Sequence, residues 1–311
     1  MTVYSQRKNS RHAFIRSSLA LVGLFMLALT LSDEISEASY NGFKFSLEVI
    51  LPSLFPFMVL SDLAAHQFCF EKSNTLSSIF ESAFKINGRA ISAFLSGMAG
   101  GFPVGAKSAL ELYKNGKISN CECERLMSFA NIPSPAYVIS AIGIGIFSSY
   151  KHGVILYFVC IFSSVICGVL IGINKNYTEN SIENVNDSYD FVSSVKKSAT
   201  ASVNLVFFIS FFCAVSSLIK ASPLPILLKA PMLLLIEITN ACGYISELCI
   251  YSDRLKLALL GFALSFSGIS VLIQSLSIDG GKEMSIQKCI LYKLLCGIIS
   301  FITVLILPFR I

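Results

Sequence analysis

The sequence has few charged residues and very few histidines. Charged side chains make up 14% of its 311 residues, whereas an ordinary soluble domain carries roughly 25%. Apolar residues make up 54% and the mean hydropathy is +0.70, so a soluble globular protein of this size is excluded. The histidines are too few and too scattered for a histidine-based metal site or a catalytic triad. They are His12, His66 and His152.

The apolar residues gather in nine blocks, which approximately cover residues 13–32, 45–66, 90–112, 126–149, 153–173, 199–219, 224–251, 255–276 and 289–309. Crossing a hydrocarbon core takes about 20 residues, so the blocks predict an integral membrane protein. Several blocks contain proline, glycine and polar residues, which a membrane tolerates only where the freed backbone lines a cavity or is buried in protein. We therefore predict an all-α polytopic helical bundle with broken or re-entrant helices, in which some blocks need not cross the membrane.

Basic residues precede the first apolar block and acidic residues follow it. Such an asymmetry places the basic side in the cytoplasm, so the N-terminus is predicted to be cytoplasmic. A cleaved signal peptide is the alternative, but the block lacks an A-x-A cleavage site at its end, which favours a retained helix. The basic residues are Arg7, Lys8, Arg11 and Arg16, and the acidic ones are Asp33, Glu34 and Glu37.

The chain carries a net charge of +5, but its lysines and arginines lie mainly between the apolar blocks. Membrane orientation explains these positions, so no nucleic acid partner is expected. Cys121 and Cys123 lack a second pair at zinc spacing, so neither a metal nor another cofactor is predicted. Six further cysteines lie inside apolar blocks and are expected to behave as small buried hydrophobic residues. They are Cys160, Cys167, Cys213, Cys242, Cys249 and Cys296.

A polar stretch rich in asparagine, serine and acidic residues divides the chain. The predicted parts are an N-terminal membrane helix with the first loop (1–44), a first half (45–173), a linker (174–198) and a second half (199–311). Residues 101–108 can be aligned with residues 268–275, which predicts two pseudo-repeats. Interrupted segments at matching places are typical of a transporter's binding site. Chance similarity between two apolar segments is the alternative.

The densest signal lies in residues 96–108. Gly97, Gly101 and Gly105 are spaced four apart and would form one small helix face, which allows another backbone to approach closely. Pro103 removes a backbone donor inside the block, however, and Lys107 places a cation where a charge is costly unless it is paired or hydrated. We therefore expect the chain to unwind at residues 100–103 and the helix to restart near Gly105.

A helix that restarts there would direct free N–H groups and the positive end of its dipole at a cavity, with Lys107 close by. An anion would fit such a site, so the break and the start of the new helix are predicted to bind a solute. The predicted residues are Gly101, Phe102, Pro103, Gly105 and Lys107. The alternative is that Lys107 lies at the water interface and pairs with Glu111, four residues later.

Proline also breaks the block around Asn131. Pro133 and Pro135 prevent a regular helix, so backbone groups near Asn131 lose their usual partners. Asn131 and Ser134 are therefore predicted to contact the solute. The alternative is a simple loop between two short helices.

An acidic residue, Glu237, lies within an apolar block and shares a helix face with Asn240, three residues later. An ionisable group at membrane depth points to function. Glu237 is therefore predicted to couple transport to a proton or cation, and Asn240 is predicted to bind the solute. The alternative is a structural salt bridge from Glu237 to Lys107 or Lys229.

Serines and a glutamine interrupt the block at residues 255–276. Helix packing explains the serines at least as well as solute contact does. Gln274 is more informative, because it lies opposite Lys107 in the aligned repeat, and it is predicted to bind the solute. The serines are Ser265, Ser267 and Ser270.

Several of these motifs together resemble a known family. They are Leu51-Pro-Ser-Leu-Phe-Pro-Phe57, Gly101-Phe-Pro-Val-Gly-Ala-Lys107 with Glu111-Leu-Tyr113, Asn131 to Pro135, and Ser267-Gly-Ile-Ser-Val271 with Gln274. From about residue 45 to the C-terminus the chain resembles the sporulation integral membrane proteins of the YlbJ type, in the nucleoside-recognition or Gate domain superfamily. It departs from that pattern at residues 267–272, where the family would have a glycine pair and a histidine.

The resemblance implies a helical fold related to the concentrative nucleoside transporters, with helical hairpins and unwound helices around a central site. For the sporulation branch it implies movement of dipicolinate, a flat dianion, from the mother cell across the outer forespore membrane.

We therefore expect a membrane transporter for a small anionic solute, with dipicolinate favoured, in the bacterial cell membrane or the outer forespore membrane. The expected partners are the lipid bilayer and the solute, and a homo-oligomer or a sporulation membrane partner is also open. The alternatives are a membrane scaffold or assembly factor in sporulation and a transporter of a nucleoside-type solute. No nucleophile, base and orienting group can be assembled from these motifs, so no enzymatic activity and no catalytic residue are expected.

Overall fold

The structure is a computed structural model that describes Ser18 and residues 22–23, 25–26, 28–67, 75–173, 175, 191–248, 251–278 and 280–307. Within these residues every regular element is helical, so the predicted all-α fold is confirmed. The basic residues at positions 7–16, Cys249 and most of the predicted linker lie outside the described residues.

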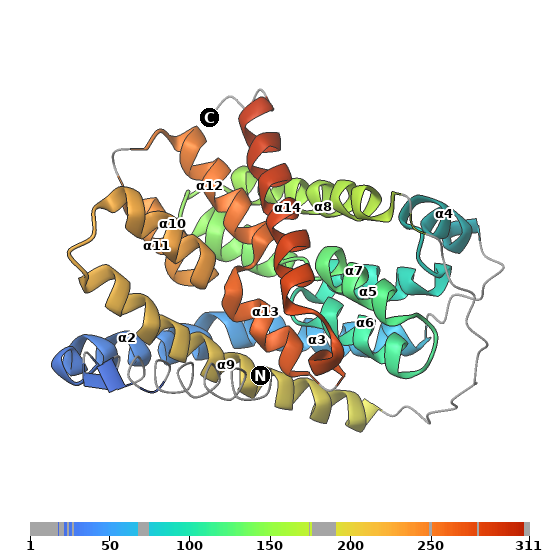
Figure 1. Ribbon diagram of the computed structural model, residues 1–311, viewed down its shortest axis with the longest axis horizontal. Helices are drawn as coiled ribbons and strands as arrows, with labels where there is room; N and C mark the ends of the chain where they lie inside the picture. The colour runs from blue at the N-terminus through green and yellow to red at the C-terminus, as the bar shows by residue number, and fades with distance from the viewer. Residues whose placement is uncertain are drawn as a thin grey trace, which may run out of the picture.

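Helices occupy both halves of the chain (Figure 1). Before the linker these are α2 (Ser32–Phe45), α3 (Leu51–Gln67), α4 (Thr75–Phe84), α5 (Ile91–Gly100), α6 (Val104–Lys114), α7 (Asn120–Ala130) and α8 (Tyr150–Gly172). After it come α9 (Phe191–Ala221), α10 (Ile226–Ile236), α11 (Ile238–Glu247), α12 (Asp253–Phe266), α13 (Gly268–Ser277) and α14 (Ile286–Ile306). Short helical turns of other pitch are η1 (Ser46–Ile50), η2 (Gly88–Ala90), η3 (Tyr137–Ile144) and η4 (Gly281–Glu283).

Among the described residues, four segments are long and apolar enough to cross a membrane: α8, α9, α12 with α13, and α14. Their mean hydropathy ranges from 1.9 to 2.8. A fifth span results if Ser32–Ile50 and Leu54–Leu60, which meet at 54°, cross as one bent segment. The protein is therefore a polytopic integral membrane protein in which several apolar blocks do not form continuous spans.

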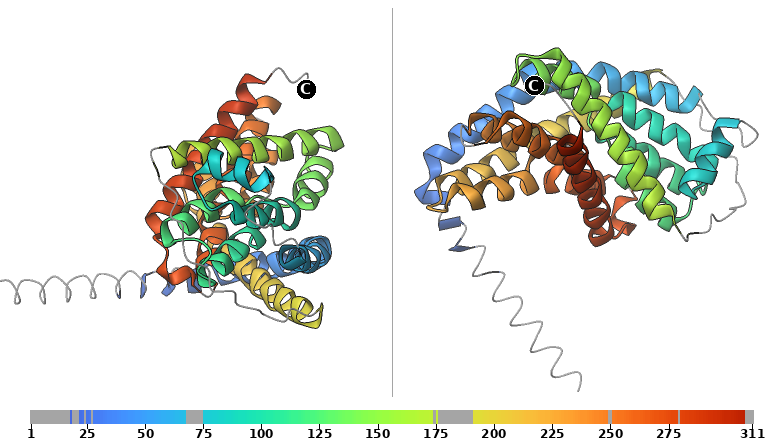
Figure 2. Two further views of the ribbon diagram at one scale, coloured as in Figure 1. Left: turned by 90° about the vertical axis from the view of Figure 1, so that its right-hand side faces the viewer. Right: turned by 90° about the horizontal axis from the view of Figure 1, so that it is seen from above.

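The helices of both halves pack around a shared interior. α2 and α3 lie along α9 at one side of the molecule, and α14 crosses α8 while also contacting α7, α12 and α13 (Figures 1 and 2). Buried side chains from α4 to α8 and from α10 to α14 form one apolar cluster. It includes the stacked rings of Phe84 and Phe129, whose centroids are 4.9 Å apart.

α9 begins at Phe191, so residues 191–198 are helical and do not belong to the predicted linker. Its 31 residues extend over about 46 Å at 1.5 Å per residue, whereas a hydrocarbon core is about 30 Å thick. The polar first turns of α9, which include Lys196 and Lys197, can therefore extend beyond the core. Composition predicted a loop there because a helix end in water has the same polarity as a loop.

Interruptions of four helices lie inside the described apolar blocks, as predicted. Residues 101–103 separate α5 from α6, residues 131–134 separate α7 from the helical turn that contains η3, Glu237 separates α10 from α11, and Ser267 separates α12 from α13. In each half, two interrupted helices precede one continuous helix, α8 or α14. This order pairs the break at 101–103 with the one at Glu237, and the break at 131–134 with the one at Ser267. The aligned repeat instead pairs 101–108 with 268–275, so the two pseudo-repeats stay a prediction: glycine and serine favour any helix break, and a short match does not distinguish one break from another.

Candidate functional site

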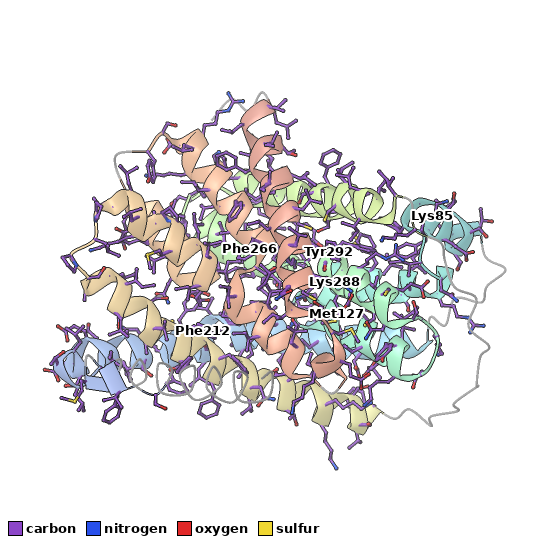
Figure 3. The ribbon with its side chains drawn as sticks, viewed as in Figure 1. Lys85, Met127, Phe212, Phe266, Lys288 and Tyr292 are labelled. Atoms are coloured by element: carbon purple, nitrogen blue, oxygen red, sulfur yellow. The ribbon has the colours of Figure 1, made fainter. Side chains whose placement is uncertain are left out.

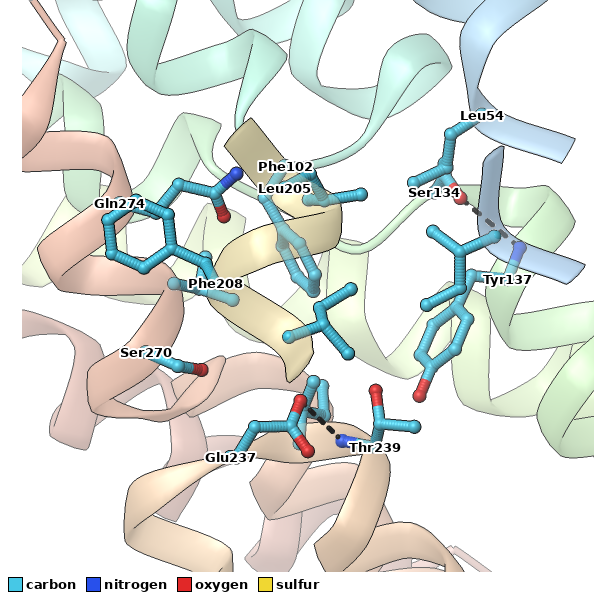
Figure 4. A pocket seen from close by; sticks show the side chains of 14 residues that line it. Leu54, Phe102, Ser134, Tyr137, Leu205, Phe208, Glu237, Thr239, Ser270 and Gln274 are labelled. Atoms are coloured by element: carbon cyan, nitrogen blue, oxygen red, sulfur yellow. Dashed lines mark hydrogen bonds between the residues drawn. The ribbon is translucent and has the colours of Figure 1, made fainter. Parts of the chain in front are cut away.

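A small cavity lies where these interruptions meet (Figure 4). It offers about 30 Å³ to the centres of water-sized molecules. The lining combines apolar side chains with hydroxyl, amide and carboxylate groups. The residues labelled in Figure 4 are Leu54, Phe102, Ser134, Tyr137, Leu205, Phe208, Glu237, Thr239, Ser270 and Gln274.

The break between α5 and α6 brings Phe102 to the cavity. Gly101 has a φ of 77°, a left-handed conformation that favours glycine. A Cβ atom at Gly101 would also lie 2.5 Å from the Cβ atom of Ser134, so a larger residue would collide with the second break. α5 ends at Gly100 and α6 starts at Val104. The predicted unwinding is therefore confirmed, with the helix restarting one residue earlier than expected.

Gly97 and Gly105 allow the end of α7 to pack against this break. A Cβ atom would lie 1.8 Å from the Ala130 carbonyl oxygen at Gly97, and 2.1 Å from it at Gly105. Non-bonded atoms cannot approach so closely, so only glycine fits either position without movement of the backbone. The small helix face therefore does pack against another backbone, and the chain also unwinds beside it.

The break after α7 places its two predicted solute contacts differently. Ser134 lines the cavity, and its Oγ accepts a hydrogen bond from the Tyr137 backbone N–H at 3.1 Å. The Asn131 side chain instead donates to Ser275 Oγ at 3.1 Å, away from the cavity lining. The structure thus puts Ser134 at the cavity and Asn131 behind it.

Glu237 forms the break between α10 and α11 and caps the N-terminus of α11. Its carboxylate accepts hydrogen bonds from the backbone N–H groups of Thr239 at 3.0 Å and Asn240 at 2.7 Å. Glu237 is 1% exposed and lines the cavity. A carboxylate at a helix N-terminus is stabilised by N–H groups and by the helix dipole, which explains how this acid is held in an apolar interior.

The neighbours of Glu237 complete this cap. Asn240 Nδ2 donates to Glu237 Oε2 at 3.3 Å, and Asn240 is not among the residues that line the cavity. Lys229, one of the lysines considered as a salt-bridge partner of Glu237, donates to the carbonyl oxygen of Lys220 at 2.8 Å. The structure therefore indicates that Asn240 holds the Glu237 carboxylate in place.

Lys107 on α6 forms an ion pair with Asp62 on α3, and the two side chains are mostly buried. The sequence had not suggested Asp62 as a partner, because it lies 45 residues away along the chain. Lys107 is also outside the set of side chains that line the cavity. Binding of an anion by Lys107 therefore stays a prediction. The contact that the structure does show, the ion pair with Asp62, holds α6 against α3.

The break between α12 and α13 supplies Ser270 and Gln274 to the cavity. Ser267 and Gly268 have left-handed φ values of 72° and 74°, which turn the chain sharply between the two helices. Gln274 is buried and lies at the cavity, where the sequence had placed a solute contact. On the α12 side, Ser265 Oγ lies 3.2 Å from a serine hydroxyl of α8, which is a helix-packing contact.

The helical segments α6, η3, α11 and α13 all start at or beside the cavity. A helix N-terminus carries a positive partial charge of roughly half an elementary charge, together with unsatisfied N–H groups. Ser134 accepts from the first N–H of η3, and Glu237 caps α11. Within the described chain no side chain caps α6, which follows Pro103, or α13. These two uncapped starts suit an anion.

Part of the lining had no place among the predicted site residues. Tyr137 and Thr239 follow Ser134 and Glu237 by three and two residues, which is the spacing of a capping side chain and its first helical turn. That spacing could have identified Tyr137 and Thr239 as site residues from the sequence. Three apolar residues of α9 carried no such signal, because they resemble every other residue of a membrane helix. They are Leu205, Phe208 and Ile209.

The chain is similar to a sporulation membrane protein. It is 34% identical over 136 residues to the sporulation integral membrane protein YlbJ of Bacillus subtilis (strain 168). The match covers 43% of this chain and 33% of the Bacillus protein, so the matched region spans about a third of that relative's length. No family model and no solved structure matches the chain. The similarity confirms the resemblance to YlbJ-type proteins and agrees with an integral membrane protein.

Proposed function

We propose that this protein is a secondary or facilitative transporter for a small anionic solute, with dipicolinate as the favoured solute. One observation carries the proposal: the interruptions of four helices meet at one cavity that contains hydroxyl, amide and carboxylate groups. Irregular backbone at membrane depth is tolerated where it lines a cavity, and transporter sites are built in this way.

The chemistry of the lining favours an anion with a flat apolar body. The uncapped starts of α6 and α13 offer N–H groups to carboxylates, and Gln274 and Ser270 add side-chain donors. The rings of Phe102 and Phe208 supply apolar surface for an aromatic ring (Figure 4). The Glu237 carboxylate is directed at the N-terminus of α11, which lowers its repulsion of a dianion.

The size of the cavity indicates which conformational state of the proposed transporter the structure represents. The space of about 30 Å³ for the centres of water-sized molecules is small for a six-membered ring with two carboxylates, so the proposal includes a widening of the cavity when the solute enters. The breaks provide the places for this movement, because a few residues at the ends of helical elements can absorb a large change of backbone angles. The structure is then the closed form of an alternating-access cycle.

The membrane and the orientation are also part of the proposal. The similar Bacillus protein is a sporulation protein by name, so we place this chain in the cell membrane or the outer forespore membrane of a sporulating cell, with its N-terminus in the cytoplasm. A reporter that is active only in the cytoplasm, fused before Met1, tests the orientation. Activity of a reporter that works only outside the cytoplasm would reverse it.

A membrane scaffold is the second candidate function. The tight contact of Gly97 and Gly105 with Ala130 favours it, because this contact serves packing and would be needed without any solute. The two functions differ in one respect: a scaffold tolerates neutral replacement of the polar side chains that line the cavity, and a transporter does not.

The decisive experiment measures accumulation of labelled dipicolinate in proteoliposomes that contain the purified full-length protein, with a labelled nucleoside in parallel. We expect uptake of dipicolinate, and Gln274→Leu should weaken its apparent affinity at least about tenfold because one hydrogen bond to a charged group is lost. Gln287→Leu is the matched control, since Gln287 is exposed on α14. Uptake of the nucleoside alone would identify the other solute class, and no uptake of either by folded, inserted protein would favour the scaffold.

A further inference from the structure

A buried lysine lies behind the cavity, on the continuous helix α14. Lys293 follows Tyr292, which Figure 3 labels on this helix, and it is 1% exposed. Its Nζ donates one hydrogen bond to the carbonyl oxygen of Asn131 and another, at 3.2 Å, to the carbonyl oxygen of Ser265. These oxygens belong to the C-cap of α7 and the last turn of α12. The ammonium group therefore joins the ends of two broken helices.

Backbone carbonyl groups supply the negative charge that balances the Lys293 ammonium. In the part of the chain that the structure describes, Lys293 forms no ion pair with a carboxylate. Each helix C-terminus carries a negative partial charge of roughly half an elementary charge, so two of them together balance about one ammonium. The carbonyl oxygens supply the hydrogen-bond acceptors that a buried charge requires.

The C-cap of α7 carries a further oxygen atom of the kind that binds free cations. Asn131 Oδ1 is buried and has no hydrogen-bond partner among the described residues. Asn131, Ser128 and Ser275 border a second, smaller cavity, which offers about 10 Å³ to the centres of water-sized molecules. Unwound carbonyl oxygens and half-helix C-termini are the groups that coordinate coupling cations in membrane transporters.

We propose that the Lys293 ammonium is a tethered cation that fills a monovalent-cation site formed by the C-terminal ends of α7 and α12. If the protein is the transporter proposed above, this site is already filled by Lys293 and transport needs no free metal cation there. This consequence rests on the proposed function. The two helix ends lead directly into Ser134 and Ser270 of the cavity lining. A cation between them therefore holds the two sides of the solute site in place.

The test removes the Lys293 amino group and then offers a free cation to the site. Purified full-length Lys293→Ala is unfolded by heat in a buffer whose cation is N-methylglucamine, which is too large for the site, and again after addition of sodium or methylammonium. We expect its Tm to lie about 5 °C or more below that of the wild type, and sodium or methylammonium should recover at least half of the difference. Gln287→Ala is the matched control on the same helix, because Gln287 is exposed and carries no charge. Its Tm should not respond to either cation.

Two further measurements keep the outcome clear. Lys293→Met fills the space without a charge, so it should be destabilised and show no recovery with either cation. Wild-type protein should have the same Tm, and the same solute uptake, with and without sodium. A Lys293→Ala variant that no cation rescues, a Lys293→Met variant as stable as the wild type, or a sodium requirement of the wild type would each overturn the proposal. Because Tm is measured without solute, this result does not depend on whether dipicolinate is transported.

Discussion

The amino group of Lys107 on α6 lies 2.6 Å from a carboxylate oxygen of Asp62 on α3. The side chains are 16% and 6% exposed, so each charge lies where an isolated charge would be costly. Lys107 is in the first turn of the helix that restarts after the break at residues 101–103. The pair therefore fixes the start of α6 against α3, close to the cavity but outside its lining.

Removing one charge of this pair should be worse than removing both. Lys107→Met should destabilise the folded protein by about 3 kcal/mol, because the buried Asp62 carboxylate loses the ammonium charge beside it. The double variant Lys107→Met with Asp62→Asn should recover most of that loss. Thermal unfolding of the purified proteins in detergent measures both effects, and equal Tm values for the single and double variants would contradict the expectation.

The same double variant decides whether Lys107 also binds the solute. We expect uptake of dipicolinate within about threefold of the wild type, because Lys107 does not line the cavity and a factor of three is less than 1 kcal/mol. Normal stability with a loss of tenfold or more, about 1.4 kcal/mol, would instead place Lys107 in the solute site, as the sequence predicted.

The glycines beside Ala130 give a prediction about packing. Gly97→Ala and Gly105→Ala should each destabilise the protein by about 3 kcal/mol or more, because the added Cβ would lie within about 2 Å of a backbone carbonyl oxygen. Gly243→Ala in α11 is the matched control, since a Cβ there would meet nothing within 4 Å. It should be neutral or stabilising by up to about 1 kcal/mol. Comparable losses in all three variants, measured by Tm and by the yield of monodisperse protein, would show that the contact with Ala130 is not the cause.

The helix breaks could be predicted from the sequence because their causes are local. Gly101, Pro103 and Pro133 act on the backbone of their own segment, by a left-handed angle or a missing N–H, so no distant contact is needed to foresee an interruption. Which break of the first half corresponds to which break of the second half could not be predicted in this way. Short matches of glycine and serine do not distinguish one break from another.

The partners of the charged residues could not be predicted, because each lies in a distant segment. Asp62 and Lys107 are brought together only when α3 packs against α6. Lys293 carried a signal in the sequence: it is a lysine inside the apolar block at residues 289–309, where an ionisable group is costly. Its acceptors are backbone carbonyl oxygens at two helix ends, which no pattern of side chains reveals.

Glu237 gives a prediction that separates capping from coupling. Glu237→Gln keeps a side-chain oxygen that can accept from the N–H groups of α11 but removes the ionisable proton. We expect solute exchange across the membrane to persist, while accumulation driven by an imposed pH gradient is lost. Glu247→Gln is the control, because Glu247 is exposed at the opposite end of α11. Unchanged accumulation in Glu237→Gln would leave the cap of α11 as the function of this residue.

Ser267 offers a stabilising substitution at the break between α12 and α13. It has a left-handed φ of 72°, it is fully buried, and its hydroxyl has no hydrogen-bond partner among the described residues. A left-handed conformation costs a residue with a Cβ atom roughly 1–2 kcal/mol, and a buried hydroxyl without a partner adds to that cost. Ser267→Gly removes both terms at an entropic cost of roughly 0.5–1 kcal/mol, so we expect a net gain of about 1 kcal/mol.

The adjacent Gly268 supplies the contrast for this last prediction. Its φ is 74°, and a Cβ atom there would lie 3.0 Å from the carbonyl oxygen of Ile236 at the neighbouring break. Gly268→Ala should therefore lower the Tm, whereas Ser267→Gly should raise it by roughly 2–4 °C. A lower Tm for Ser267→Gly would mean that the hydroxyl has a bonded partner in the folded protein, such as a buried water, and that the serine is retained for that contact.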